Sequence, residues 1–184
     1  MQKPVALALG LVAVITVGVG QRARAQETPD RQQPILVGAF QVFKRTDAIT
    51  NEDRSAIATF SSAMATGSSD RVAFLAWNCK PDGLRVQYSF GQLMNSVGDR
   101  VIVRYRFADT PATERELWNL ATGHKSTFLP KVDVTRFTRE AGSFQTVAIR
   151  VRNLESEVTD VFRLDGLTEA LSLLPCYRQS GPTH

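Results

Sequence analysis

Cys79 and Cys176 are the only cysteines of this chain, and their redox state decides which chemistry they can perform. A free thiolate is a nucleophile and a metal ligand, whereas an oxidised pair is neither. A zinc site needs closely spaced ligands, and the sequence has no CxxC motif and only two histidines. In an exported protein an even number of cysteines favours pairing, so we expect one structural disulfide; two buried free thiols are the alternative.

Signatures of catalysis are scarce in this sequence. It contains no GxSxG and no HExxH motif, and no SxxK motif with its partner motifs. His124 follows Gly123 in an expected loop, where it is either a lone general base or a solvated loop histidine. His184 is the last residue. The sequence therefore predicts a protein that is not an enzyme, with no catalytic residue, no cofactor and no metal ligand set.

One polar segment carries several oxygen ligands close together. Asp47, Asn51, Glu52 and Asp53 supply carboxylate and amide oxygens, which are the ligands that calcium prefers. Their spacing does not match an EF-hand, which needs a glycine and a distal glutamate. The alternative is a polar turn in which these side chains bond to neighbouring backbone amides.

Arg104, Arg106 and Trp118 form the candidate site for a ligand or partner. Alternation over residues 101–107 puts both arginines on one face of a strand, opposite the apolar side chains. We expect Trp118, on a neighbouring short strand, to be exposed as well. Two guanidiniums beside an indole could bind an anion or a sugar ring. The alternative is a solvated face on which the arginines pair with acids further along the chain: Glu155, Glu157 or Asp160.

Short strands must position these residues. Hydrophobic alternation and turn residues predict strands over 35–43, 55–64, 71–79, 84–90, 101–107, 117–120, 143–152 and 158–164. Thr66–Asp70 and Lys80–Gly83 read as turns. We expect Trp77 and Phe162 in the core.

Two segments have helical rather than strand periodicity. A short helix is expected within residues 131–140. A second helix is expected over residues 165–174, with Asp165 as its N-cap and Pro175 ending it. The strands and this last helix together predict a mainly β fold: an antiparallel β-sandwich or barrel-like domain with one short C-terminal α-helix.

Residues 1–25 have the order of a secretory signal peptide. Lys3 precedes an apolar run over residues 5–20, and Ala23-Arg24-Ala25 offers the small residues that a signal peptidase accepts. The run is shorter than the roughly 20 residues of a membrane-spanning helix. We expect cleavage after Ala25 and export to the periplasm or the extracellular space. The alternative is a retained anchor, which would bring the domain into contact with the membrane on its periplasmic side.

The rest of the chain suits a single domain. Residues 26–34 read as a flexible lead-in, residues 35–177 as one β-rich domain and residues 178–184 as a disordered tail. Residues 1–25 carry three cations and no acid, so the remaining 19 cations and 18 acids leave a net charge of +1. This near-neutral balance gives no support for a nucleic acid as partner.

Several blocks of this sequence occur together in one known group of proteins. The blocks are VGAFQVFKRTDAITNEDRSAIATFSSA, LAWNCKPDGLRVQYSF, VIVRYRFADTPATERELWNLATGHKSTFLP and VAIRVRNLESEVTDVFRLDGLTEALSLLPC. In this order they resemble the secreted β-domains typified by the type VI secretion-associated periplasmic proteins. Two positions depart from that pattern: Phe40 stands where the family usually has tryptophan, and Asn51 where it often has aspartate. The resemblance implies a β-fold, an envelope location and an accessory or binding role without an established catalytic centre.

Three functions follow as hypotheses, each with a structural signature. An accessory or adaptor subunit of a larger envelope or membrane assembly would bind protein partners, and predicts an exposed apolar patch or an open sheet edge. A periplasmic binding module for a cell-wall fragment or small anion predicts a concave pocket around Arg104, Arg106 and Trp118. A hydrolase predicts a titratable pair in a cleft.

Overall fold

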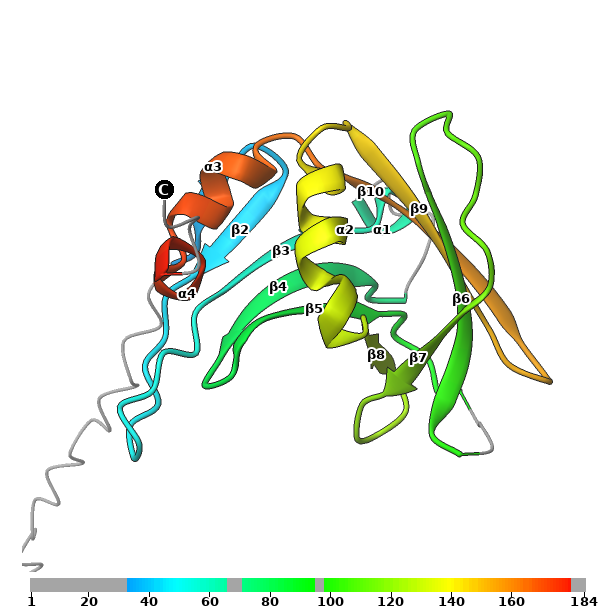
Figure 1. Ribbon diagram of the computed structural model, residues 1–184, viewed down its shortest axis with the longest axis horizontal. Helices are drawn as coiled ribbons and strands as arrows, with labels where there is room; N and C mark the ends of the chain where they lie inside the picture. Colours follow the sequence, from blue (N-terminus) through cyan, green and yellow to red (C-terminus); the bar gives the residue numbers. More distant parts are fainter. Residues whose placement is uncertain (1–32, 66–70, 95–97, 180–184) are drawn as a thin grey trace, which may run out of the picture. The chain divides into compact units, whose positions relative to one another are not determined.

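Residues 33–65, 71–94 and 98–179 are described by a computed structural model. Residues 1–25, most of the lead-in, the turn at residues 66–70 and the last five residues of the tail lie outside this part of the chain. In the described ranges, ten strands form one antiparallel sheet in the order β1-β2-β3-β4-β5-β8-β7-β6-β9-β10 (Figure 1). The strands are β1 (Ile35–Val37), β2 (Phe40–Phe43), β3 (Ala56–Phe60), β4 (Phe74–Lys80), β5 (Gly83–Ser89), β6 (Arg100–Phe107), β7 (Glu116–Leu120), β8 (Ser126–Phe128), β9 (Thr146–Arg152) and β10 (Glu157–Arg163).

Short helices complete this part of the chain and lie beside the sheet: α1 (Ser62–Ala65), the 3₁₀ turn η1 (Lys131–Asp133), α2 (Val134–Ala141), α3 (Leu167–Ser172) and α4 (Pro175–Gln179). Helix α2 lies across one face of the sheet (Figure 1). Its Phe137 packs against Trp77, Tyr105 and Phe107, and Trp77 Nε1 donates a hydrogen bond to Thr138 Oγ1 at 2.9 Å. The mainly antiparallel β fold with a short C-terminal helix is therefore confirmed, as is the helix expected within residues 131–140.

The described strands do not close into a barrel, but the last strand, β10, returns to the region of β3. Ser61, next to the end of β3, makes an isolated antiparallel bridge with Phe162 of β10. Asp160 of β10 is 2 % exposed and accepts hydrogen bonds from Ser61 Oγ at 3.0 Å, from Tyr88 Oη and from both terminal nitrogens of Arg71. Burial, followed by the charge of Asp160, raises the pKa of Tyr88. The alternative in which Asp160 pairs with Arg104 or Arg106 is wrong, because Asp160 lies at a buried position of β10 and pairs with Arg71.

Several boundaries differ from the sequence prediction. The strand expected over 35–43 is a two-strand hairpin that turns at Gly38, where φ is +57°. A Cβ at Gly38 would lie 2.2 Å from the carbonyl oxygen of Asp165, so both the backbone conformation and the close approach need glycine. The strand expected over 55–64 ends at Phe60, since α1 follows. The short strand β8 was not predicted, because three residues give no periodicity.

The C-terminal helix also begins and ends differently from the prediction. Gly166 takes the N-cap position of α3 without a side-chain bond, and the Asp165 carboxylate accepts from Arg163 Nε at 2.9 Å, so the prediction of an Asp165 cap is wrong. Helix α3 ends at Ser172, and Pro175 starts α4 instead of ending the first helix. Proline is tolerated at the first position of a helix because the amide there has no intrahelical acceptor.

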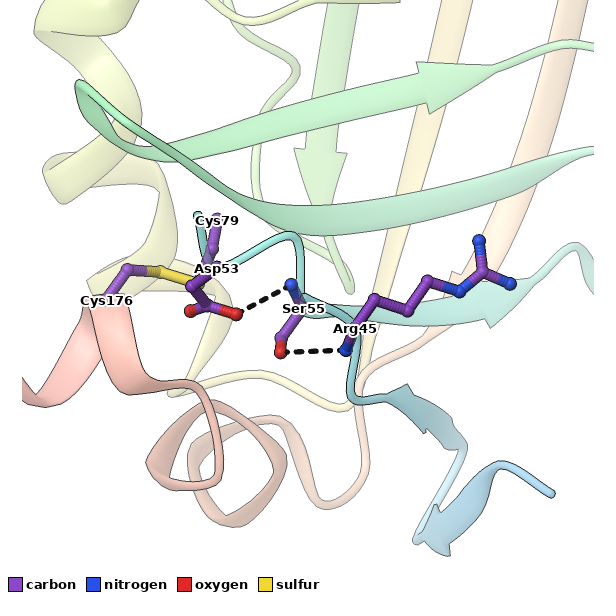
Figure 2. The surroundings of a disulfide bond; sticks show 5 residues. All are labelled: Arg45, Asp53, Ser55, Cys79 and Cys176. Atoms are coloured by element: carbon purple, nitrogen blue, oxygen red, sulfur yellow. Dashed lines mark hydrogen bonds between the residues drawn. A yellow bond between two sulfur atoms is a disulfide. The ribbon is translucent and has the colours of Figure 1, made fainter. Parts of the chain in front are cut away.

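A disulfide ties the end of the chain to the sheet. Cys79 of β4 and Cys176 of α4 are bonded, with Cα atoms 5.7 Å apart (Figure 2). Cys79 is buried and Cys176 is half-buried. The predicted pairing is confirmed, and the alternative of two free thiols is excluded.

Candidate functional site

Three arginines form a row across adjacent strands on the outward face of the sheet. Arg104 of β6 is paired in register with Arg150 of β9. On the other side of β6, Val103 is paired with Glu116 of β7, so Arg115, immediately before Glu116, lies level with Arg104. The chain just before Arg115 is held against β6 by a backbone hydrogen bond, which Thr113 N–H donates to the carbonyl oxygen of Tyr105 at 2.8 Å. We call Arg115, Arg104 and Arg150 the arginine row.

Alternation along β6 explains why these cations share one face. Val101, Val103, Tyr105 and Phe107 are buried, whereas Arg100, Arg104 and Arg106 are exposed. Strand β9 repeats the pattern, with Arg150 and Arg152 exposed between buried residues. Paired positions of an antiparallel ladder lie on the same side of the sheet, with Cβ atoms ~5 Å apart. The register therefore places like charges side by side, which is an arrangement that destabilises a sheet.

The arginine row lines a hollow with a volume of about 830 Å³. Five arginines and two glutamates line it, which gives its lining a net charge of +3; the lining residues are Arg100, Ile102, Arg104, Arg115, Arg150, Arg152, Asn153, Leu154, Glu155 and Glu157. Ligand pockets have volumes of roughly 300–1,000 Å³. The hollow is thus of ligand size, and its charge attracts anions.

The guanidiniums of the hollow differ in how they are held. Arg150 Nε lies 3.4 Å from Glu157 Oε1 and donates to Thr159 Oγ1 at 3.0 Å. Arg104 Nε donates to the carbonyl oxygen of Thr113 at 3.0 Å, which leaves its two terminal nitrogens for another acceptor. Within the described ranges, the guanidiniums of Arg115 and Arg152 have no ion pair. Some guanidiniums of this face are thus held in place by neighbours, and others have no ion pair in the described part of the chain. Such a set suits an anion that accepts hydrogen bonds from several guanidiniums at once.

Only one member of the predicted three-residue site lines this hollow. Arg104 does, whereas Arg106 lies on the same outward face but is not among the lining residues. Trp118 is fully buried, so the expectation that it is exposed is wrong. Its partner in register is Val101 on the inward face, and its Nε1 donates to Glu116 Oε2 at 2.9 Å. Trp118 contacts the ring of Tyr105 and belongs to the core.

The rest of the site was missed by sequence reasoning. Alternation over 143–152 already separates Arg150 and Arg152 from the apolar residues of that strand. The pairing of β9 with β6 is the missing information, since the two strands are separated by β7, β8 and α2 along the chain. Trp77 and Phe162 are fully buried, as expected.

The polar segment at residues 47–53 forms the turn that was the alternative to a calcium site. Asp47 Oδ1 accepts from the amides of Ile49 and Thr50, both at 3.0 Å, and these bonds lower the pKa of Asp47. Arg54 Nη2 lies 2.7 Å from Glu52 Oε2. His124 lies in the turn between β7 and β8, with Nε2 3.3 Å from Asp99 Oδ1 and a side chain that is 36 % exposed. These contacts fit a capped turn and a solvated loop histidine.

The carboxylate of Asp53 lies beside the disulfide (Figure 2). Its Oδ1 accepts from the amide of Ser55 at 2.9 Å, while its Oδ2 is buried without a hydrogen-bond partner. Asp53, Cys79 and Cys176 bring three ligand-type atoms within 4.8 Å of one another. Both sulfurs are consumed by the disulfide, so this group is no metal site while the bond is intact.

Comparison with family models, with curated proteins and with solved structures finds no match. The resemblance to type VI secretion-associated periplasmic proteins stays a prediction from the sequence. Among the described residues, no helix combines the length and the apolar character needed to cross a membrane.

Proposed function

We propose that this protein is an exported, non-catalytic binding module that takes an anionic ligand onto the arginine row. The observation that carries the proposal is the row itself: Arg104 and Arg150 are paired in register, Arg115 lies level with Arg104 immediately before β7, and all three line one hollow. Like charges that face each other across a strand pair destabilise a sheet, so this arrangement is unfavourable without a ligand. An anion bound between the guanidiniums would offset their mutual repulsion and accept charge-assisted hydrogen bonds from them.

Local charge rather than overall charge supports an anionic ligand. The chain without residues 1–25 carries a net charge of +1, whereas the hollow alone carries +3. The positive charge is therefore concentrated on one concave surface, where it focuses the electrostatic potential. The signal-like order of residues 1–25 and the disulfide support export, because disulfides persist in oxidising compartments.

Calorimetric titration with inorganic phosphate tests this function. We expect Arg104→Gln to weaken binding by at least about tenfold, since a hydrogen bond to a charged group contributes about 1.5–3 kcal/mol. Arg106→Gln is the matched control, because Arg106 lies on the same strand and face but outside the hollow. Equal losses in the two variants, or no binding by the unmodified protein, would refute the proposal.

An accessory role in an envelope assembly is the second candidate, and an open sheet edge favours it. Among the described residues, strand β1 lies at one end of the strand order, and its Leu36 is 73 % exposed and its Ile35 47 % exposed. A sheet edge with no partner strand among the described residues can accept a strand from another protein. A pull-down from solubilised envelope with the unmodified protein and with Leu36→Lys tests it. Loss of a stoichiometric partner only in the variant supports the accessory role, and the absence of any partner contradicts it.

A further inference from the structure

An aliphatic pair lies directly beside the arginine row. Ile102 of β6 and Leu117 of β7 are paired in register, one outward position along each strand from Arg104 and Arg115. Leu117 is 57 % exposed, whereas the next residue of the same strand, Trp118, is buried. Successive outward positions of a strand are ~7 Å apart. The aliphatic pair and the arginine row therefore lie within reach of one ligand.

Cations surround this aliphatic pair on several sides. Arg152 is the register partner of Ile102 on β9, and Arg100 is the next outward residue of β6 beyond Ile102. Leu154, at the turn between β9 and β10, is 93 % exposed and lines the same hollow. Exposed apolar groups inside a polar rim mark a surface that is covered when the protein acts.

The lining of the hollow narrows the chemistry of the ligand. None of its described lining residues is aromatic, so a nucleobase or a sugar ring would find no flat side chain to stack on. A small inorganic anion would contact the guanidiniums and leave uncovered Ile102 and Leu154 in the lining and Leu117, the register partner of Ile102, beside it. A molecule that joins an anionic group to an aliphatic chain matches both kinds of side chain.

We infer that the ligand is a single anionic amphiphile, with its headgroup on the arginine row and its alkyl chain over Ile102, Leu117 and Leu154. The inference rests on the proposed anion-binding function. Charge complementarity fixes the sign of the headgroup, and the volume of about 830 Å³ fits one molecule of ordinary ligand size. The class includes fatty acids and short-chain anionic phospholipids.

Three phosphates of increasing apolar content test the inference: inorganic phosphate, glycerol 3-phosphate and phosphatidic acid with two six-carbon chains, kept below its micellar concentration. Burial of each methylene strengthens binding about fourfold. We therefore expect the phosphatidic acid to bind at least about tenfold more tightly than glycerol 3-phosphate, since two buried methylenes suffice. Equal affinities for these two ligands would overturn the inference while leaving the proposed function intact.

Two variants locate the alkyl chain without changing any charge. The double variant Leu117→Ser/Leu154→Ser should remove most of the affinity advantage that the phosphatidic acid has over glycerol 3-phosphate. Val132→Ser is the matched control, because Val132 is 89 % exposed on η1, does not line the hollow and, unlike Leu117, is not paired in register with a residue that does. An advantage that survives the double variant would place the chain elsewhere and contradict the inference.

Binding to vesicles separates a single molecule from a membrane surface. Vesicles of phosphatidylcholine with and without phosphatidylglycerol are the probes, monitored by sedimentation of bound protein. Binding to the anionic vesicles alone, with no binding of monomeric phosphatidic acid, would replace the single-ligand site by a membrane-docking surface. Failure of every phosphate to bind would instead refute the anion-binding function itself.

Discussion

Arg104 and Arg150 face each other in register across β6 and β9, two cations paired where a stable sheet would place opposite charges. Arg115 extends the row on the other side of Arg104. Two of the three guanidiniums are held by neighbours, Arg150 by Glu157 and Thr159 and Arg104 by the carbonyl of Thr113. A surface that keeps cations together at a cost in stability is typical of binding sites, where local strain serves the ligand.

Relieving this repulsion should stabilise the protein. Arg115→Gln removes one cation beside Arg104, and no hydrogen bond of the Arg115 guanidinium within the described residues is lost with it. We expect the free energy of unfolding to rise by about 0.5 kcal/mol at low salt. The gain should shrink as salt is added, because ions screen exposed charges. Urea denaturation at two ionic strengths, with Arg106→Gln as control, measures it; a loss of stability in Arg115→Gln would contradict the account.

The disulfide should contribute a large share of stability. It closes a loop with a sequence separation of 97 residues, for which loss of chain entropy in the unfolded state contributes about 4–5 kcal/mol. Dithiothreitol should therefore lower the urea midpoint of the unmodified protein strongly. Cys79→Ala/Cys176→Ala should start from the lower midpoint and not respond to the reductant. A midpoint of the unmodified protein that is insensitive to reduction would show that the sheet is held without this bond.

Tyr88 should make stability depend on alkaline pH. Burial, followed by the charge of Asp160, raises its pKa above the usual value of 10.0. The folded protein therefore keeps this proton at a pH where the unfolded chain has lost it, and the free energy of unfolding falls as the pH rises above about 10. Tyr88→Phe removes this contribution to the slope. Denaturation of both proteins between about pH 8 and pH 11 measures the difference; parallel curves above pH 10 would contradict the buried Tyr88–Asp160 contact.

Gly38 should tolerate no side chain. In Gly38→Ala the Cβ would lie 2.2 Å from the Asp165 carbonyl, at a φ of +57°. We expect a loss of about 3 kcal/mol, the sum of backbone strain and overpacking. Gly83→Ala is the control, since Gly83 also has a positive φ but nothing lies within 4 Å of an added Cβ. Its loss should be about 1–2 kcal/mol, from backbone strain alone. Equal losses would show that the turn at Gly38 does not approach the start of α3.

The fold class could be predicted from the sequence because alternation is a local property. Residues 101–107 and 143–152 show their buried and exposed faces without any knowledge of their neighbours. The disulfide followed from the count of cysteines and from the expected export. The turn at Gly38, which divides the first expected strand into two, could not be predicted. A two-residue turn inside an apolar run does not change the hydrophobic pattern.

The candidate site could not be predicted as fully, because it is defined by register. Arg104 was identified from its own strand, whereas Arg150 and Arg152 joined it only through the β6–β9 pairing. Trp118 was misplaced for the same reason: its pairing with Val101 turns the indole inward. The local sequence predicts which residues share a face of one strand. It does not predict which strands pair, because strand pairing depends on packing between segments that are far apart along the chain.

Amide chemical shifts in a phosphate titration test most directly whether the arginine row binds an anion. The amides of the row and its flanks, within residues 102–104, 113–115 and 150–152, should shift together with one binding curve. The amides around Asp53 and the disulfide should stay unchanged and serve as an internal control. Coherent shifts on the three segments are the predicted result. Shifts confined to another part of the chain, or none at all at high phosphate, would contradict the central claim.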